Sequence, residues 1–235
     1  TGYKIPEAEK LSIANAGKQQ KSPWREADGP EAYGEATPVG VRQLGRAMAI
    51  SSDGYITGMR QYREPINFMD LGCGIGKLVA QAYFEWPSVE RATGIELSPT
   101  RAAHAREAWE VAISSGEADK LRTAALALAE AGGSAPVSTP LSAEEAVHFV
   151  EGDIFKVDVS DATHIYVSSR CFHEAMVRRL ALKLGAEATR LQTVATLRPF
   201  PEGLEGFKHL GSIGVEMSWT AYRDGGETTH IYTRA

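Results

Sequence analysis

Ile66-Asn67-Phe68-Met69-Asp70-Leu71-Gly72-Cys73-Gly74-Ile75-Gly76-Lys77 is the stretch that decides the fold of this 235-residue chain. Its apolar residues up to Leu71 predict a short buried strand, of the kind found in the middle of a parallel sheet. The three glycines that follow let backbone N–H groups approach a ligand at the start of a helix. That helix is predicted by apolar residues at helical spacing, namely Leu78, Val79, Ala82, Tyr83 and Trp86.

Acidic residues end this strand and two later strand-like runs. Asp70 lies just before the glycines, and Glu96 and Asp153 end the next two runs. Glu96 follows Gly76 by 20 positions (96 − 76), about where nucleotide-binding folds place a carboxylate for ribose hydroxyls. Three strands that each end in an acid resemble class I S-adenosylmethionine-dependent methyltransferases. The alternatives are a nicotinamide-dependent Rossmann enzyme, in which the Gly152-Asp153 pair is unusual, or a turn with unrelated acids.

Composition sets limits on the class of protein. A content of 43% hydrophobic and 23% charged residues is ordinary for a globular chain, and the length suits one α/β domain with an extension. No uncharged apolar run is long enough to predict a membrane span. The net charge of −5 argues against direct binding of nucleic acid through its phosphates. We assign no metal ligands. Cys73 and Cys171 suggest reduced thiols in a cytoplasmic or nuclear protein, and Thr1 in place of Met suggests a fragment.

The chain divides into an N-terminal extension, residues 1–32, and a domain, residues 33–235. The extension is polar, and residues 7–20 are expected to form one exposed helix, with a flexible arm as the alternative. Residues 51–64 are predicted to be a loop. Alanine-rich residues 114–141 are interpreted as an insertion, or as a long helix with a surface loop.

The remaining elements complete a sheet. Thr37 is a good N-cap and Pro38 a good first residue for a helix. Strands are expected at 163–167 and 189–197, and an antiparallel hairpin at 214–221 and 228–233 with a glycine-rich turn. The predicted fold is therefore α/β: a Rossmann-like sheet of five parallel strands plus an antiparallel edge hairpin, flanked by helices, with a small helical N-terminal extension.

Short motifs around the glycine turn point to one family. Tyr33-Gly34-Glu35 precedes the turn, and Gly152-Asp153, Arg198-Pro199-Phe200 and Ser218-Trp219-Thr220 follow it. From about Tyr33 to the end, apart from residues 114–141, the chain resembles histone lysine methyltransferases of the disruptor-of-telomeric-silencing type, which are not SET proteins. Shared ancestry does not by itself imply a shared substrate.

The resemblance implies S-adenosyl-L-methionine as cofactor and S-adenosyl-L-homocysteine as product. It implies a Tyr-Gly-Glu loop that covers the cofactor, Glu96 on the ribose and Asp153 on the adenine amino group, while Asp70 and the glycines hold the methionine end. The candidate cofactor-binding residues are Tyr33, Glu35, Thr37, Asp70, Gly72, Gly74, Gly76, Lys77, Glu96, Asp153, Ile154 and Ser168.

The chain departs from the family where the methyl acceptor should lie. The family's Asn-Asn-Phe-x-Phe is replaced by Ser168-Ser169-Arg170-Cys171-Phe172. Arg170 would repel a lysine ammonium group unless it points away or pairs with a carboxylate; alternatively it forms a surface salt bridge or clamps a substrate carboxylate. Ser168, Arg170, His173 and His230 are the candidate catalytic residues. The histidines can act as bases, although a lone histidine is more often structural.

Three functions are consistent with these residues. The first is a protein lysine methyltransferase, acting on a histone in the nucleosome or on another protein. The second is a methyltransferase of the same fold with a small-molecule acceptor, favoured if a closed polar cavity surrounds Arg170 and His230. The third is a module that binds the cofactor but has lost catalysis.

Overall fold

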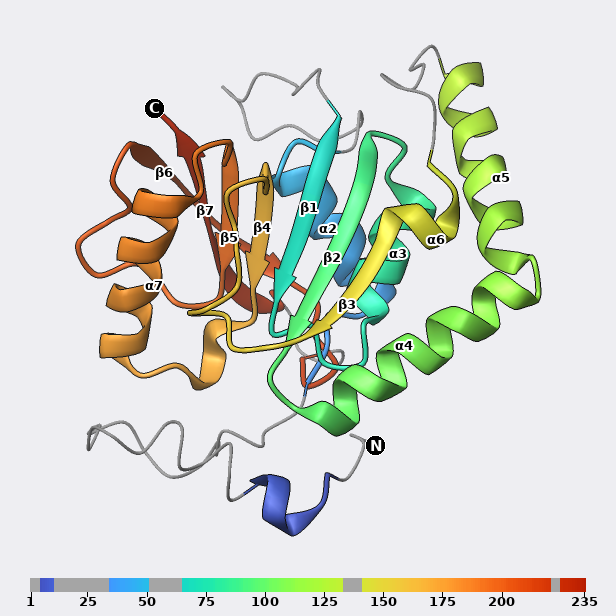
Figure 1. Cartoon of the computed structure of the whole chain (residues 1–235). Helices are drawn as coiled ribbons and strands as arrows, with labels where there is room; N and C mark the ends of the chain where they lie inside the picture. The colour runs from blue at the N-terminus through green and yellow to red at the C-terminus, as the bar shows by residue number, and fades with distance from the viewer. Residues whose placement is uncertain (1–4, 11–33, 51–64, 133–140, 221–224) are drawn as a thin grey trace.

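The computed structural model describes residues 5–10, 34–50, 65–132, 141–220 and 225–235. These residues form one seven-stranded sheet, in which the first five strands in spatial order are parallel and the last two are antiparallel (Figure 1). In spatial order the strands are β3 (Val147–Glu151), β2 (Val89–Glu96), β1 (Ile66–Leu71), β4 (His164–Val167), β5 (Thr193–Thr196), β7 (Glu227–Arg234) and β6 (Phe207–Val215). The predicted sheet is confirmed.

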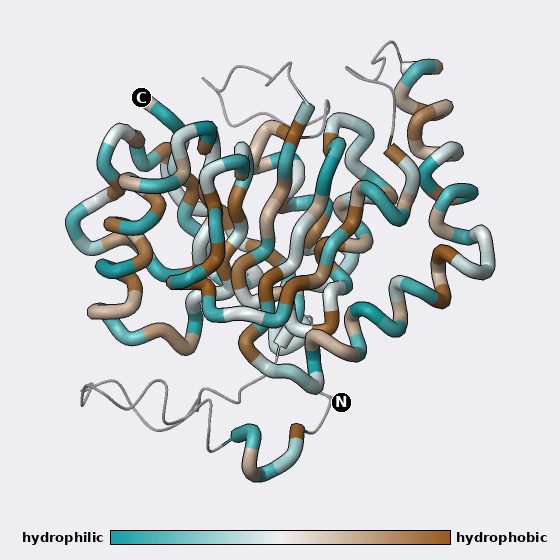
Figure 2. The backbone as a smooth tube through the Cα atoms, in the orientation of Figure 1, coloured by the Kyte–Doolittle hydropathy of each residue, from teal (hydrophilic) through white to brown (hydrophobic). Residues whose placement is uncertain are grey.

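Helices cover both faces of the sheet. The helices are α2 (Pro38–Ala47), α3 (Lys77–Glu85), α4 (Pro99–Ser114), α5 (Glu117–Ala131), the short α6 (Ala143–Ala146), and α7 (Glu174–Glu187), with a 3-10 turn η1 at Ser169–Cys171. Residues of α2, α3 and α4 belong to one buried apolar cluster, and residues of α7 belong to a second. Hydrophobic residues gather along the central strands (Figure 2).

The central strand β1 divides its side chains between these two clusters because successive residues of a strand point to opposite faces. Ile66 and Phe68 join the cluster of α3, where the Phe68 ring meets the Trp86 ring edge-on at 5.3 Å. Leu71 joins the cluster of α7. Burial on both faces explains why this strand reads as an almost continuous apolar run in the sequence.

The last hairpin differs from the prediction in its first strand. That strand was expected at 214–221, but β6 ends at Val215 and residues 216–220 leave the sheet. Met217 instead forms an antiparallel bridge with Ala36. The backbone groups of this segment are therefore satisfied by a distant part of the chain, which local strand propensity cannot reveal. Of the predicted turn, residues 221–224 lie outside the described residues.

Several other expectations also lie outside the described residues: Tyr33, the boundary between 1–32 and 33–235, the loop at 51–64, and most of the extension. Residues 7–10 of that extension are helical. In the alanine-rich region Gly116, with φ of +73°, separates α4 from α5. No helix in the described ranges is both long and apolar enough to span a bilayer. Cys73 and Cys171 do not form a disulfide.

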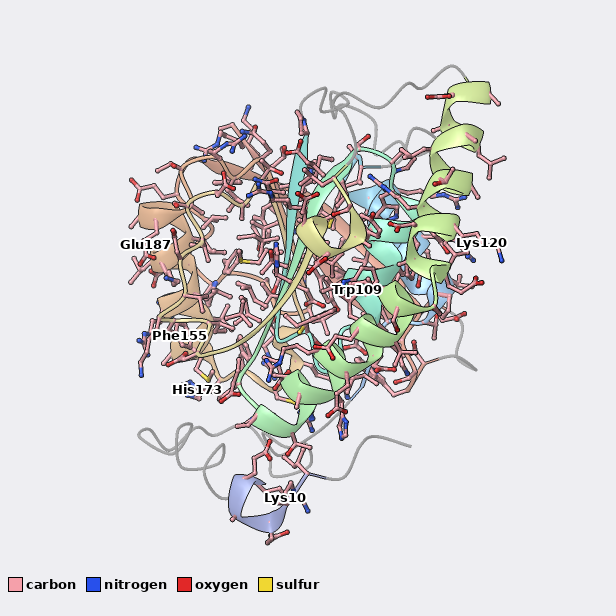
Figure 3. The ribbon with its side chains drawn as sticks, turned by 45° about the vertical axis from the view of Figure 1, so that its right-hand side comes forward. Lys10, Trp109, Lys120, Phe155, His173 and Glu187 are labelled. Atoms are coloured by element: carbon pink, nitrogen blue, oxygen red, sulfur yellow. The ribbon has the colours of Figure 1, made fainter. Side chains whose placement is uncertain are left out.

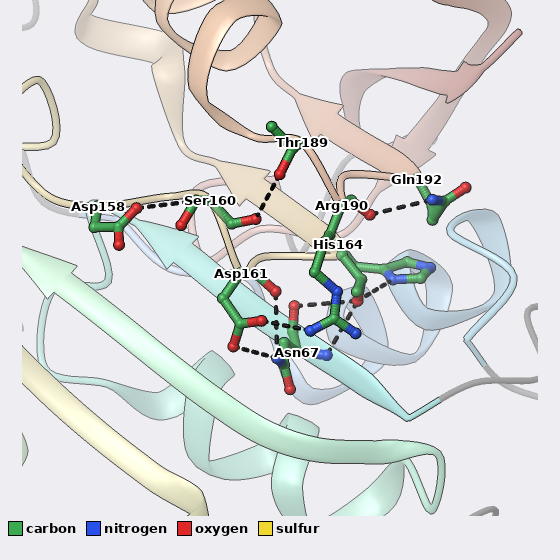
Figure 4. A network of polar contacts seen from close by, with 9 residues as sticks. Asn67, Asp158, Ser160, Asp161, His164, Thr189, Arg190 and Gln192 are labelled. Atoms are coloured by element: carbon green, nitrogen blue, oxygen red, sulfur yellow. Dashed lines mark hydrogen bonds and ion pairs between the residues drawn. The ribbon is translucent and has the colours of Figure 1, made fainter.

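Polar side chains join the strands at the amino ends of β1 and β4 (Figure 4). Asn67 Nδ2 donates to Asp161 Oδ2 at 2.6 Å, and Arg190 forms an ion pair with Asp161. Thr163 Oγ1 lies 3.0 Å from Nδ1 of His164. Burial lowers the pKa of His164 to about 3, so this imidazole is neutral at physiological pH. This edge is a structural network, and the candidate site lies at the opposite edge.

Candidate functional site

The glycine turn links β1 to α3 at the carboxyl edge of the sheet. Gly72 has a φ of +95° with open space where a side chain would be, so its conformation rather than crowding requires glycine. Gly74 and Gly76 also have positive φ, and a Cβ on Gly76 would come within 2.3 Å of the Phe149 ring. The turn thus combines a special backbone with close packing against β3.

Glu96 ties the end of β2 to this turn. Its carboxylate is buried, and it accepts hydrogen bonds from Gly74 N and Ser98 N, each at 2.8 Å. Ser98 is also the N-cap of α4, and Pro99 is the first residue of that helix. Both backbone donors fix the orientation of the carboxylate. Residues 7–10 approach the same place, because the Glu9 carboxylate accepts a hydrogen bond from the Thr100 hydroxyl at 2.5 Å.

Asp70 has a buried carboxyl oxygen that the fold leaves unsatisfied. Its side chain is 3% exposed, and its Oδ1 has no hydrogen-bond partner within the described part of the chain. Burial, and to a lesser extent the charge of Glu96, raises the pKa of Asp70 to about 8. A buried carboxyl oxygen without a donor is costly, and a ligand with a cationic donor would remove that cost.

Asp153 lies on the same edge, next to Glu96. Strand β3 ends at Glu151, and Gly152 N donates to the Glu96 carbonyl at 2.9 Å. The Asp153 carboxylate accepts from Phe155 N at 2.9 Å and remains about one-third exposed. Ile154 is buried in the cluster of α7. The three predicted acids therefore lie at or just beyond the carboxyl ends of the adjacent strands β1, β2 and β3.

Gly34 and Glu35, the described part of the Tyr-Gly-Glu segment, meet the Ser-Trp-Thr segment beside the glycine turn. Ser218 N donates to the Glu35 carbonyl at 2.7 Å, and a Cβ on Gly34 would come within 2.1 Å of the Trp219 ring. Glu35 Oε2 pairs with Lys77 Nζ at 2.6 Å, at the first residue of α3. Residues 183 positions apart in sequence (218 − 35) thus form one layer beside the turn.

Thr37 has the capping role that the sequence predicted. Its side chain accepts from Gly40 N, and Pro38 opens α2. The hydroxyl also donates to Glu216 Oε1 at 2.6 Å, which fastens α2 to the segment that follows β6.

On the other side of β1 the polar residues pair with one another. Arg170 Nη1 and Trp219 Nε1 each donate to Oε2 of Glu227 at 2.9 Å. The Arg170 guanidinium carbon also lies 5.2 Å from the centre of a Trp219 ring. Arg170 therefore pairs with a carboxylate, which is one of the arrangements that the sequence left open.

Tyr166 connects this pair to Asp70. The two residues are opposite each other in the register of β4 and β1, and Tyr166 is hydrogen-bonded to the Ser168 side chain. Burial raises the pKa of the Tyr166 phenol, and the charges of Asp70 and Glu227 act in the same direction. Both carboxylates therefore lie within electrostatic reach of one tyrosine hydroxyl.

The two histidines lie away from this cluster. His173 is the N-cap of α7, where its Nδ1 accepts from Met176 N at 3.2 Å (Figure 3). His230 lies 2.8 Å from the Ser212 hydroxyl, on the face of β7 opposite Glu227 by strand alternation. Burial, and then His209, lowers the pKa of His230. His230 and Glu227, the partner of Arg170, therefore lie on opposite faces of β7.

Sequence reasoning missed Tyr166 and Glu227, and it treated Trp219 only as part of a motif. The available signal for Glu227 was its position as the first residue after the Gly225-Gly226 turn, which places it at the carboxyl edge of the parallel strands. Within the described ranges, no group of three or more His, Cys, Asp or Glu side chains is placed to hold a metal ion.

No protein-family model and no curated protein sequence matches the chain. Solved structures do match it. TrmN from Thermus thermophilus has a TM-score of 0.52 and 17% identity, over 85% of this chain and 49% of that chain. An RNA methyltransferase from Salinibacter ruber, in complex with S-adenosyl-L-homocysteine, has a TM-score of 0.49 and 19% identity, over 83% of this chain and 89% of that chain. The mitomycin 7-O-methyltransferase MmcR has a TM-score of 0.45 and 17% identity, over 83% of this chain and 54% of that chain.

At these identities the similarity establishes the fold: the chain has the fold of class I S-adenosylmethionine-dependent methyltransferases. It spans about half the length of the TrmN and MmcR chains. The similarity does not single out the disruptor-of-telomeric-silencing type within this class.

Proposed function

We propose that the carboxyl edge of β1, β2 and β3 binds S-adenosyl-L-methionine and that the chain is a methyltransferase. The observation that carries this proposal is the unsatisfied, buried oxygen of Asp70 beside the glycine turn and the Glu96 carboxylate. The methionine end of S-adenosyl-L-methionine carries an ammonium group, which is the cationic donor that Asp70 lacks. The donor and acceptor groups present therefore fit this cofactor.

Each residue of this edge then has one task. Glu96, already oriented by two backbone N–H groups, accepts hydrogen bonds from the ribose hydroxyls. Asp153, one-third exposed beside it, accepts one from the adenine amino group. Glu35 and Lys77 close the layer that excludes water. When bound, the cofactor supplies a methyl group on a sulfonium, and the chain aligns the acceptor with it.

For the acceptor we propose a lysine side chain of a protein, a histone in the nucleosome being one candidate. Pairing with Glu227 supports this choice because it balances the charge by which Arg170 would repel a lysine ammonium group. The polar side chains of Ser168 and Tyr166 favour the second candidate, a small-molecule acceptor, whose site need not be narrow and apolar. A cofactor-binding module without catalysis is the third.

Transfer of labelled methyl from S-adenosyl-L-methionine to two pools tests these candidates in parallel. One pool contains nucleosomes and total protein, and the other contains a metabolite extract. We expect label in protein, retained on lysine after hydrolysis. Label in metabolites alone would replace the lysine proposal with the small-molecule one. Cofactor binding by calorimetry without label in either pool would favour the module that lacks catalysis, and no cofactor binding would refute the proposed function itself.

A further inference from the structure

The sheet order separates the site into two halves, defined by what lies on each side of β1. Asp70, Glu96 and Asp153 lie at the carboxyl ends of β1, β2 and β3, whereas Arg170 follows β4 and Glu227 begins β7. With adenine at β3 and the methionine end at β1, as proposed above, an acceptor reaches the methyl group from the side of β4, β5 and β7. The following inference rests on that proposed function.

Glu227 has an unused oxygen on this side. Both of its side-chain hydrogen bonds, from Arg170 and Trp219, go to Oε2. Neither of these donors reaches Oε1, and the side chain is 25% exposed. A carboxylate oxygen accepts about two hydrogen bonds, so Oε1 has capacity for a ligand donor.

The surroundings of Glu227 hold its carboxylate in one orientation. The Trp219 ring packs against Gly34, where a Cβ would come within 2.1 Å of it. The Arg170 guanidinium lies 5.2 Å from a Trp219 ring and donates to the same oxygen as Trp219 does. Two donors from separate segments therefore fix Oε2 and leave Oε1 in a defined position.

Arg170 also sets the charge of the pair. An isolated carboxylate beside an amine favours the ammonium form, which has no lone pair for attack on a methyl group. In the Arg170–Glu227 pair the positive charge offsets the negative one. The pair can therefore accept a hydrogen bond from an N–H group without strongly favouring the cation.

We propose that Glu227 is an acceptor-binding residue, whose Oε1 accepts a hydrogen bond from the nitrogen of a lysine side chain while Arg170 and Trp219 position it. This assigns the acceptor class as a primary amine with N–H donors. An acceptor that presents a carboxylate fits less well because Arg170 is already paired with Glu227.

A pair of matched variants tests this assignment. Glu227→Gln keeps the size of the side chain and removes its charge. Glu85→Gln is the control: Glu85 also pairs with an arginine, Arg42, at 2.6 and 2.8 Å, and the substitution changes the net charge equally outside the site. The probe is a pool of histone peptides that contain lysine, and its binding is compared with that of the same pool after lysine acetylation. The protein is saturated with S-adenosyl-L-homocysteine in both measurements.

We expect the wild type and Glu85→Gln to bind the unmodified pool at least tenfold more tightly than the acetylated pool. In Glu227→Gln this preference should fall below twofold, with affinity for S-adenosyl-L-homocysteine unchanged within twofold by calorimetry. Equal binding of both pools by the wild type, or an undiminished preference in Glu227→Gln, would overturn the assignment. If the wild type did not bind S-adenosyl-L-homocysteine at all, the proposed function itself would be refuted. Failure of the Glu227 assignment and failure of the proposed function are therefore distinguishable.

A charge swap separates binding from a purely structural ion pair. Arg170→Glu combined with Glu227→Arg restores an ion pair of the opposite orientation. If the ion pair only joins the segment after β4 to β7, the swapped variant should have both the wild-type melting temperature and the wild-type preference for unmodified lysine. We expect recovery of the melting temperature without recovery of the preference.

Discussion

The two halves of the site are built in different ways. In the proposed cofactor half, which contains Asp70, Glu96 and Asp153, Glu96 is held by backbone N–H groups, one of them from the glycine turn 22 positions earlier (96 − 74). In the proposed acceptor half, which contains Arg170, Trp219 and Glu227, Glu227 is held by the side chains of Arg170 and Trp219, and Arg170 lies 57 positions away in sequence. The first arrangement depends on a local fold motif, and the second depends on which side chains the tertiary structure happens to bring together. The acceptor half should therefore be the more variable half among proteins of this fold.

The largest expected effect is on cofactor binding. Glu96→Ala removes the acceptor for two ribose hydroxyls, each worth about 1.5 kcal/mol or more as a hydrogen bond to a charged group, so the affinity should fall roughly 100-fold. The matched control is Glu151→Ala, because Glu151 is the register partner of Glu96 on β3 and is half-exposed. Calorimetry with S-adenosyl-L-methionine measures both. Equal affinities of the two variants for S-adenosyl-L-methionine would show that Glu96 does not bind the cofactor.

The second prediction concerns the buried carboxyl of Asp70 in the absence of ligand. Its folded-state pKa of about 8 lies above the unfolded value of 3.8, so the stability it contributes is present below pH 4 and is lost as the pH rises towards 8. Relative to Asp70→Asn, the wild type should lose up to about 1.4 kcal/mol of unfolding free energy per pH unit in this range. Urea unfolding of both proteins from pH 5 to pH 8 measures the difference. If the unfolding free energies of the two proteins changed in parallel with pH, Asp70 would be ionised in the folded protein.

The third prediction tests the contact that joins the two halves. Gly34→Ala places a Cβ against the Trp219 ring and should destabilise the fold by about 1–3 kcal/mol, since the ring or the segment must move. Gly185→Ala is the control: this glycine lies within α7, where a Cβ would make an ordinary 3.6 Å contact, and the change should stabilise the fold by up to about 1 kcal/mol. Thermal unfolding compares the two. A loss of stability in both variants would contradict the specific role of Gly34.

The smallest expected effect is that of the indole donor. Trp219→Phe removes one hydrogen bond to Glu227 and keeps an aromatic ring at this position. Binding of the unmodified lysine peptides should weaken about fivefold, as expected for a loss of about 1 kcal/mol of binding free energy. Trp109→Phe removes a comparable donor, to the Ala143 carbonyl, far from Glu227. It should lower stability without changing peptide binding. An equal loss of peptide binding in both variants would show that the effect is not local to Glu227.

Most of the fold could be predicted from the sequence because its signals are local. The apolar run of β1, the glycines and the caps at Thr37 and Ser98 each specify structure within a few residues. The error in the first hairpin strand arose where a local signal was overridden: residues 216–218 pair with residues 35–37 rather than extending β6. Strand propensity does not carry information about such a distant partner.

The same distinction applies to the site. By itself the sequence determined that three successive strand-like runs end in Asp70, Glu96 and Asp153, and a parallel sheet brings the carboxyl ends of its strands to one edge. Only the tertiary structure decided that Arg170 pairs with Glu227, that Trp219 shares the same oxygen, and that His230 lies on the opposite face of β7. The physical reason is that backbone periodicity places strand ends, whereas contacts between side chains depend on how distant segments pack.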